Sequence, residues 1–444
     1  MKKMKLFNLA WPIFIETALF MLLGFIDVFV LSKYNDLAAS AVNTANQAVS
    51  IVTIVFTVIS GASAVIISQC LGAKNKKGAS RVAALSLTFN IAFGLIISAV
   101  LFFFNTPILK FIGADGTILD YSSQYLAIVG GTLFFQAVLS ATSVIIRNHG
   151  MTQVSMYVTV GMNIVNTVLD VIFVLGLFGM PRLGVLGVAI ATSFSRFIGT
   201  IVLLIVLFKK IEKPSIFKLL KPFPWGDVKN IVKIGVPSAL ETFLYNLSQL
   251  VITSIVLKCM TETDLITKTY VQNITMFFYI FAVSIGQASQ ILIGHLVGAK
   301  KFDEAYRQGF RGYRNALIVT FILSATGALL GQYIMGIFTT NQTIIMLGAN
   351  VLLIDIILEF GRTTNLVVIA CLRGAGDVIF PTGCAIFSMW VISTLGAYIL
   401  AVALGFGIYG LWIAFAADEC FRGIMMIFRW KSRKWESKRI ATNS

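Results

Sequence analysis

Apolar runs of about 20 residues, separated by short polar segments, follow one another along almost the whole chain. A helix of that length spans a hydrocarbon core about 30 Å thick. The pattern therefore predicts an all-α integral membrane protein with twelve transmembrane helices. The predicted spans are residues 9–31, 44–68, 83–104, 122–146, 154–178, 184–208, 235–257, 269–296, 315–335, 342–371, 379–403 and 408–428.

Four short segments recur in the same order in the two halves of the chain, at a spacing of 223 to 226 residues. Such a regular repeat indicates an internal duplication with six spans in each half. Because six is an even number, both halves enter the membrane in the same orientation. This predicts two parallel six-helix repeats, related by a pseudo-twofold axis along the membrane normal, around a central cavity. The matching segments are 12–16 and 237–241, 71–74 and 297–300, 147–150 and 373–376, and 183–187 and 406–410.

A basic, proline-rich stretch at residues 209–233 separates the halves, with seven lysines and three of the eight prolines. This composition is typical of a connecting segment rather than a span. We therefore predict an N-terminal six-helix lobe over 1–208 and a linker over 209–233. A C-terminal lobe over 234–428 and a basic tail over 429–444 complete the chain.

The net charge of +16 comes from basic residues that are concentrated in alternate loops between the predicted spans. With the N-terminus placed in the cytoplasm, 27 of the 35 Lys and Arg residues fall in cytoplasmic segments and five in outer loops. The other three are Arg196, Arg362 and Arg422, within spans. This positive-inside pattern predicts that both termini are cytoplasmic in a bacterial-type cytoplasmic membrane. The basic excess then reflects contact with anionic lipid, and no nucleic-acid partner is expected.

Composition removes several other classes of function. The chain is 57% hydrophobic and has a mean hydropathy of +0.88. Its five cysteines and two histidines show no disulfide, zinc or catalytic spacing, and no phosphate-binding or dinucleotide-binding glycine motif is present. We therefore predict a protein that is not an enzyme, carries no cofactor or metal beyond a possible Na+, and draws on an ion gradient for work.

Acidic residues within apolar spans are the main candidates for function, because each costs at least about 2.5–3.5 kcal/mol at mid-membrane depth. Asp27 and Asp170 have no basic neighbour in their own spans. Asn163, Asn166 and Asp170 stand at i, i+3 and i+7 and form one polar stripe. Their oxygens suit either a proton or Na+. We predict a cation-coupling site formed by Asp27, Asn163, Asn166 and Asp170.

The acids of the tenth and twelfth spans have arginines at helix-neighbour spacing. Glu359 and Arg362 are three residues apart, and Arg422 follows Asp418 by four residues and Glu419 by three. A carboxylate matched in this way favours a structural ion pair over an ion site. Glu241 of the seventh span has no such basic neighbour and is a functional candidate.

Several motifs resemble those of the multidrug and toxic compound extrusion (MATE) transporters, and the resemblance covers almost the whole chain. The tenth span, with Glu359-Phe360-Gly361-Arg362, and the twelfth, with a DExxRG motif, are similar to one branch of that family. The other motifs are GFID at 24–27, QCLGAKN at 69–75, NIVNTVLDVIFVLG at 163–176, PSALE at 237–241 and LRGAGD at 372–377.

The resemblance implies an antiporter that expels amphipathic, often cationic or aromatic compounds in exchange for H+ or Na+. It maps the N-lobe ion site of the family onto Asp27, Asn166 and Asp170, and its seventh-span acid onto Glu241. Where some members carry an acid in span ten, this chain has Arg362.

For the cavity between two alternating lobes, we predict a lining of bulky apolar side chains that binds drug-like molecules loosely in a monomeric protein. Glu241 and four apolar residues are the candidates, although packing is the more common role of such residues: Met156, Met162, Phe277 and Phe278. Two alternatives remain. A lipid-linked oligosaccharide flippase would share the architecture but need several cationic residues in its cavity, and a multispan transferase would need catalytic residues at one membrane face.

Overall fold

The structure is a computed structural model that describes residues 5–32 and 34–440. Nine of its described helical segments are long and apolar enough to cross a membrane. Eight of them are α1 (Leu6–Ser32), α2 (Asp36–Gly72), α3 (Lys76–Phe103), α7 (Thr152–Leu175), α8 (Val185–Val206) with its extension η2 (Leu207–Ile211), α9 (Trp225–Cys259), α10 (Glu262–Gly298) and α13 (Gln342–Ala375). The ninth is a composite span, Ile379–Ala403. It is made of α14 (Ile379–Ser388), η4 (Met389–Thr394), α15 (Leu395–Ala397) and η5 (Tyr398–Ala403).

Two further spans are helices broken near glycines. The fourth consists of α5 (Gly116–Gly131) and α6 (Phe134–Asn148), bent by 46°, and the ninth of α11 (Phe302–Leu329) and α12 (Gly331–Phe338), bent by 69°. The predicted twelfth span lies on α16 (Gly407–Lys431), a helix with charged residues along its length that is not among these apolar segments. The predicted all-α fold with twelve transmembrane helices is thereby confirmed, and each predicted span lies on one of these segments.

Short helices occupy several of the connections. They are α4 (Asn105–Ile112), η1 (Leu177–Gly179), η3 (Pro214–Leu220) and η6 (Lys434–Lys438). The predicted linker, residues 209–233, is partly helical, since it contains η3 and the start of α9 at Trp225. Helix η3 packs against α3. Ser80 of α3 also donates a hydrogen bond of 2.8 Å to Glu212 of the linker.

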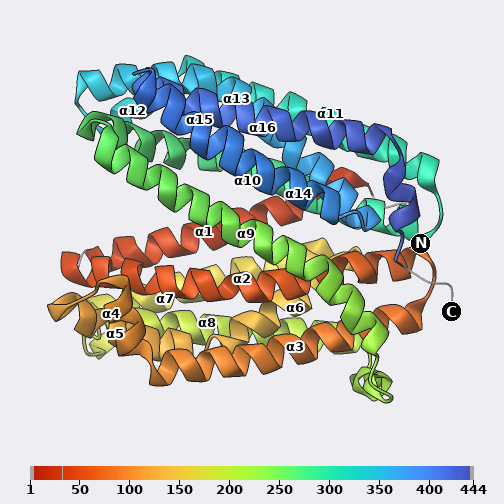
Figure 1. Cartoon of the computed structure of the whole chain (residues 1–444). Coiled ribbons are helices and arrows are strands. Elements are labelled where there is room, and N and C mark those ends of the chain that lie inside the picture. Colours follow the sequence, from red (N-terminus) through yellow and green to blue (C-terminus); the bar gives the residue numbers. More distant parts are fainter. Residues whose placement is uncertain (1–4, 33, 441–444) are drawn as a thin grey trace. The chain divides into compact units, whose positions relative to one another are not determined.

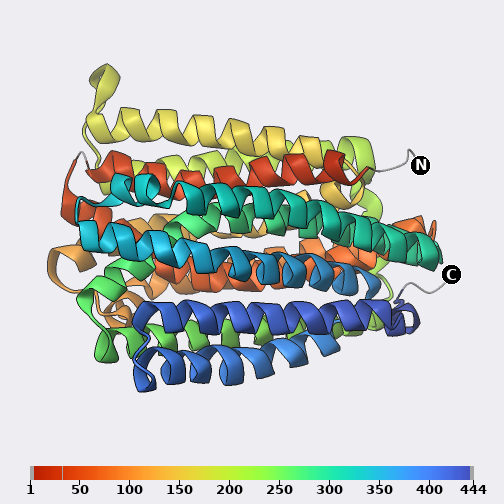
Figure 2. The same ribbon diagram turned by 90° about the horizontal axis from the view of Figure 1, so that it is seen from above.

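The chain divides into two units. Unit 2 comprises 11–67 and 75–235, and unit 1 comprises 1–10, 68–74 and 236–444. Within unit 2, α3 packs against α5 and α6, and α8 packs against α5, α6 and α7. Within unit 1, α13 packs against α10, α11 and α16 (Figure 1), and α16 runs beside the composite span (Figure 2). Each unit has an apolar core of its own.

Candidate functional site

Helices α1 and α7 bring the two predicted acids of unit 2 to a common depth. Asp27 lies five residues before the end of α1, and Asp170 lies five residues before the end of α7. These helices are the first and fifth spans, so they cross the membrane in the same direction. Both acids therefore stand about 8 Å from the same end of their helices. Both are buried, with at most 2% of either residue exposed.

Asn166 joins the two carboxyl groups. With its amide nitrogen facing the acids, it donates to Asp27 Oδ1 and to Asp170 Oδ2, both at 3.1 Å. The two buried carboxyl groups therefore accept from one amide, and as ionised carboxylates they would repel each other. A proton or another cation at the site relieves that repulsion. Three of the four predicted coupling residues thus form one cluster.

The fourth predicted residue, Asn163, lies on the same helix but makes a different contact. Its side-chain nitrogen donates to the backbone oxygen of Thr159 at 2.9 Å, and its amide oxygen has no hydrogen-bond partner. Asp170 Oδ1 is likewise buried without a partner. The site therefore retains two unused acceptor oxygens on the face of α7.

Residues from α5 and α8 complete the site, and the sequence pattern did not indicate them. Thr192 of α8 donates to Asp27 Oδ2 at 3.4 Å. The hydroxyl of Tyr125 in α5, which donates to Asn46 Oδ1 at 3.3 Å, lies near Thr192 and both acids. Arg196, one turn beyond Thr192, interacts electrostatically with Asp27 and Tyr125, and its buried Nη1 has no hydrogen-bond partner. The acid pair therefore has a cation of its own, held on a neighbouring helix.

The duplicated glutamates, Glu16 and Glu241, occupy equivalent ion pairs. Glu16 accepts a hydrogen bond from Ser143 at 2.8 Å and lies 3.8 Å from Arg147. Glu241 lies 2.8 Å from Arg373. Both arginines belong to the repeated motif at 147–150 and 373–376, so the duplication extends to the side-chain pairing.

This pairing bears on the predicted role of Glu241 in substrate binding. Its carboxylate also accepts a hydrogen bond from Thr382 at 3.0 Å, and the residue does not line the pocket of unit 1 described below. The carboxylate of Glu241 thus already has two partners, Arg373 and Thr382, and its role in substrate binding remains a prediction.

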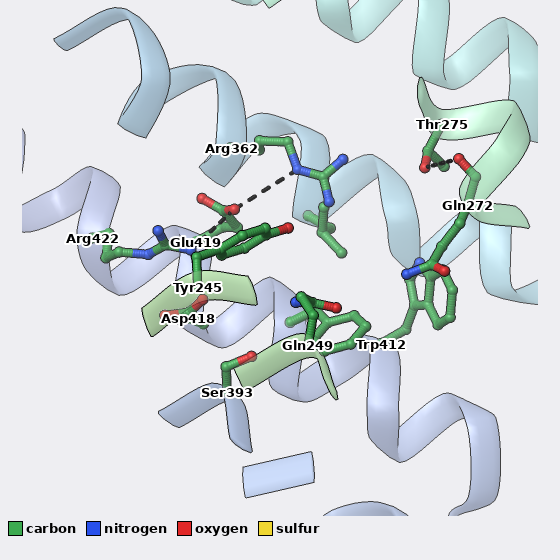
Figure 3. Close-up of a pocket in the computed structure, with 12 residues that line it drawn as sticks. Tyr245, Gln249, Gln272, Thr275, Arg362, Ser393, Trp412, Asp418, Glu419 and Arg422 are labelled. Atoms are coloured by element: carbon green, nitrogen blue, oxygen red, sulfur yellow. Dashed lines mark hydrogen bonds and ion pairs between the residues drawn. The ribbon is translucent and has the colours of Figure 1, made fainter. Parts of the chain in front are cut away.

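A small polar pocket with a volume of about 50 Å³ lies among α9, α10, α13, η4 and α16 of unit 1 (Figure 3). Aromatic and amide side chains form part of its wall, and charged side chains from α13 and α16 form the rest. The lining residues are Tyr245, Gln249, Gln272, Thr275, Leu358, Arg362, Ser393, Trp412, Phe415, Asp418, Glu419 and Arg422. This pocket was not predicted, because its walls come from separate spans.

The charged wall of the pocket contains the ion pairs expected from spacing. Arg362 contacts Glu359, and Arg422 lies 2.6 Å from Asp418 and 3.1 Å from Glu419. An additional bridge runs between helices, from Arg362 Nε to Glu419 Oε1 at 3.8 Å. The pairs therefore form one network across α13 and α16, part of which faces open space.

The four apolar residues predicted for the cavity have different surroundings. Met162 is buried against the backbone of Gly199, and Phe278 is buried in the core of unit 1. Met156 is buried in α7, whereas Phe277 is largely exposed. None of the four lines the pocket of unit 1. Packing explains Met162 and Phe278, and a cavity role for any of the four remains a prediction.

Twelve spanning helices in two equivalent halves, with buried acids at matched depth, define a membrane transporter. The chain belongs to the MatE family: a sequence model of that family matches residues 12–172 and again 237–399. Both halves match the same model, in agreement with the duplication. The predicted membership of the MATE transporters is thereby confirmed, and the protein is an integral membrane transporter and not an enzyme.

Relatives of known name match almost the full length. The chain is 40% identical over 440 residues to the uncharacterized transporter YisQ of Bacillus subtilis, covering 99% of this chain and 96% of the relative. It is 28% identical to the probable multidrug resistance protein NorM of Thermotoga maritima, covering 99% and 94%. A crystal structure of MATE in the bent conformation shares the fold with a TM-score of 0.85 at 19% identity, covering 97% and 95%.

Proposed function

We propose that this protein is a secondary antiporter that exports amphipathic small molecules in exchange for protons by alternating access. The observation that carries the proposal is the pair of buried carboxyl groups, Asp27 and Asp170, joined by the side-chain amide of Asn166. The name of the Thermotoga maritima relative, a probable multidrug resistance protein, supports a drug-like substrate. The charge pattern of the loops supports cytoplasmic termini, and we propose that the protein works as a monomer.

The chemistry of the pair favours H+ over Na+ as the coupling ion. A proton on one carboxyl group removes the repulsion between the two, and Asn166 holds both groups close together. Sodium would instead need several oxygen atoms converging on one point. The structure has carboxyl groups facing each other and, beside them, the cationic side chain of Arg196.

Loss of the proton would leave two carboxylates in contact within a medium of low dielectric. Their repulsion would be opposed by Asn166, by Thr192 and by the charge of Arg196. The protonated and deprotonated forms therefore favour different arrangements of α1 against α7 and α8. An ion shifts a conformational equilibrium only by its differential affinity for the two states, and this site supplies such a difference.

For the substrate we propose the pocket of unit 1, because it combines aromatic side chains with polar and charged groups on its walls. A lipid-linked oligosaccharide remains the second candidate. A pyrophosphate would bring several negative charges to a wall whose two arginines, Arg362 and Arg422, are already balanced by acids. The pocket therefore favours a small amphipathic molecule.

The test is dye efflux from proteoliposomes with a pH gradient and a sodium gradient imposed separately. We expect efflux to follow the pH gradient in the wild type and to be lost in Asp27→Asn and Asp170→Asn, while both variants insert normally and still bind dye. Efflux that follows only the sodium gradient would show that the coupling ion is Na+ and not H+. Full gradient-driven efflux by Asp27→Asn would overturn the coupling site.

A further inference from the structure

The pocket of unit 1 contains a charge arrangement that is incomplete without a ligand. Arg362 Nε and Glu419 Oε1 face each other at 3.8 Å, which is too long for a hydrogen bond. Arg422 is almost fully buried and lines the same wall, yet its Nε has no hydrogen-bond partner. A buried guanidinium N–H without an acceptor costs free energy, so the wall gains from a ligand that supplies one.

We propose that the pocket binds the head group of a zwitterionic substrate, with a carboxylate toward Arg362 and an ammonium toward Glu419. Figure 3 shows the two side chains on one wall, with Tyr245 beside them and Gln249 and Trp412 across the open space. A head group with adjacent opposite charges replaces one long ion pair by two charge-assisted hydrogen bonds. This inference rests on the proposed substrate role of the pocket.

Charge balance separates a zwitterion from a singly charged ligand. The lining carries two arginines, Arg362 and Arg422, and two acids, Asp418 and Glu419. A ligand with both charges keeps this balance. A simple cation would bind Glu419 alone, and a simple anion would bind Arg362 alone. Either one would lose the second new bond.

Three dansyl compounds provide a matched test of this preference. Nε-dansyl-lysine is the zwitterion, dansylcadaverine is the same molecule without the carboxylate, and 6-(dansylamino)hexanoic acid is the same molecule without the amine. Equilibrium fluorescence titration of the purified full chain in detergent measures their affinities. Because binding needs no gradient, a failure here differs from a failure of ion coupling, which the efflux experiment detects separately.

We expect the zwitterion to bind at least about tenfold more tightly than either analogue, the effect of one charge-assisted hydrogen bond. Arg362→Gln should remove the preference over the cation, and Glu419→Gln the preference over the anion. Gln249→Ala, which lines the pocket outside the ion network, should weaken all three compounds by a similar factor.

Since Arg362→Gln leaves Glu359 without its partner, the double variant Glu359→Gln/Arg362→Gln provides a second measurement on a less perturbed background. Equal affinities for the three compounds in the wild type would overturn the proposal. So would an unchanged preference in a Glu419→Gln variant that elutes as folded protein.

A separate observation concerns the C-terminal tail, which is anchored beside the last turn of α2. After α16, Trp435 is fully buried and stacks on Trp430 at 4.3 Å between ring centroids. This fixes the chain so that Ile440 N donates to Gln69 Oε1 at 2.8 Å and Arg439 donates to Gly298 O at 3.1 Å. The tail thus holds the end of α2 and the end of α10 at once.

These two helix ends cross at van der Waals contact through equivalent glycines. A Cβ atom on Gly72 would lie 2.0 Å from the backbone oxygen of His295, and one on Gly298 would lie 2.0 Å from that of Gln69. The spacing of 226 residues relates both partners. The end of α2, from residue 68 onward, therefore belongs to unit 1 together with α10, whereas the preceding part of α2 belongs to unit 2.

We infer that residues 439–440 are a latch that holds this crossing closed and must detach before it opens. Gln69 also donates to Gly374 O at 2.9 Å, so the same side chain connects the tail, α2 and the end of α13. The latch needs no ligand, and its contacts lie at the opposite end of α13 from the predicted outer loops.

Cys70, next to Gln69 and buried, is a native reporter of opening when the other four cysteines are replaced. We expect truncation after Lys438, or Arg439→Gln, to raise the rate of Cys70 alkylation by a membrane-permeant maleimide by about tenfold, the effect of one or two hydrogen bonds. Lys438→Gln is the matched control, because its side chain is exposed. An unchanged alkylation rate in the truncated, folded protein would overturn the latch.

Discussion

We predict that removing Arg362 from its ion pair with Glu359 lowers the stability of the protein more than removing Glu359 does. Glu359 is fully buried, with 0% of its side chain exposed, whereas the Arg362 side chain is 21% exposed and also reaches Glu419. Removing the arginine therefore leaves an uncompensated buried carboxylate, at a cost of about 3–5 kcal/mol. Removing the glutamate leaves an arginine with a second partner and some access to solvent, so we expect the loss to be smaller by at least about 1 kcal/mol.

The assay is unfolding of the purified variants in mixed micelles with increasing denaturing detergent. Arg362→Gln should be the least stable, Glu359→Gln intermediate, and the double variant Glu359→Gln/Arg362→Gln more stable than Arg362→Gln. Lys301→Gln breaks an exposed pair of the same i, i+3 geometry, with 55% and 52% of the side chains exposed. That control should change stability by less than about 1 kcal/mol. A stability of Arg362→Gln equal to the wild type would refute this reasoning and make the pair purely functional.

Two further predictions concern packing and topology. Gly361→Ala should destabilise unit 1 by about 1–3 kcal/mol in the same unfolding assay, because the new Cβ atom would lie 2.7 Å from the backbone nitrogen of Cys420. Gly24→Ala is the control: a Cβ atom there has nothing within 4 Å, so this change should be neutral or stabilising. Equal effects of both would contradict the close crossing of α13 and α16. In intact cells, an impermeant thiol reagent should label cysteines introduced at the outer positions 115–117 and 262–264, and should not label those at the linker positions 218–226. Labelling of the linker would overturn the predicted orientation.

Periodicity was sufficient to predict the spans and part of the site. The stripe of Asn166 and Asp170 lies on one face of α7 because a helix repeats every 3.6 residues, and the lone acid Asp27 is buried because only a specific partner compensates its cost in lipid. The repeat predicted two equivalent halves of six spans, and the structure extends this equivalence further than predicted. Glu16–Arg147 and Glu241–Arg373 show this at the level of side chains.

Contacts between spans could not be predicted in this way. Arg196 is separated from Asp27 by 169 positions, and no single-span pattern indicates which helix face it meets. The same holds for Glu241, which lacks a basic neighbour in α9 but meets Arg373 from α13. The adjacent residues Phe277 and Phe278 have the same chemistry and opposite burial, because they point to different sides of α10.

The proposal that Asp27 and Asp170 couple transport to protons is tested most directly by measuring proton release when substrate binds to purified protein in a weakly buffered solution. In exchange transport, the ion and the substrate favour different states, so binding of one reduces occupancy by the other. We expect about one proton to be released per bound substrate in the wild type, and none in Asp27→Asn or Asp170→Asn. Substrate binding without proton release in the wild type, or unchanged release in both variants, would contradict the account.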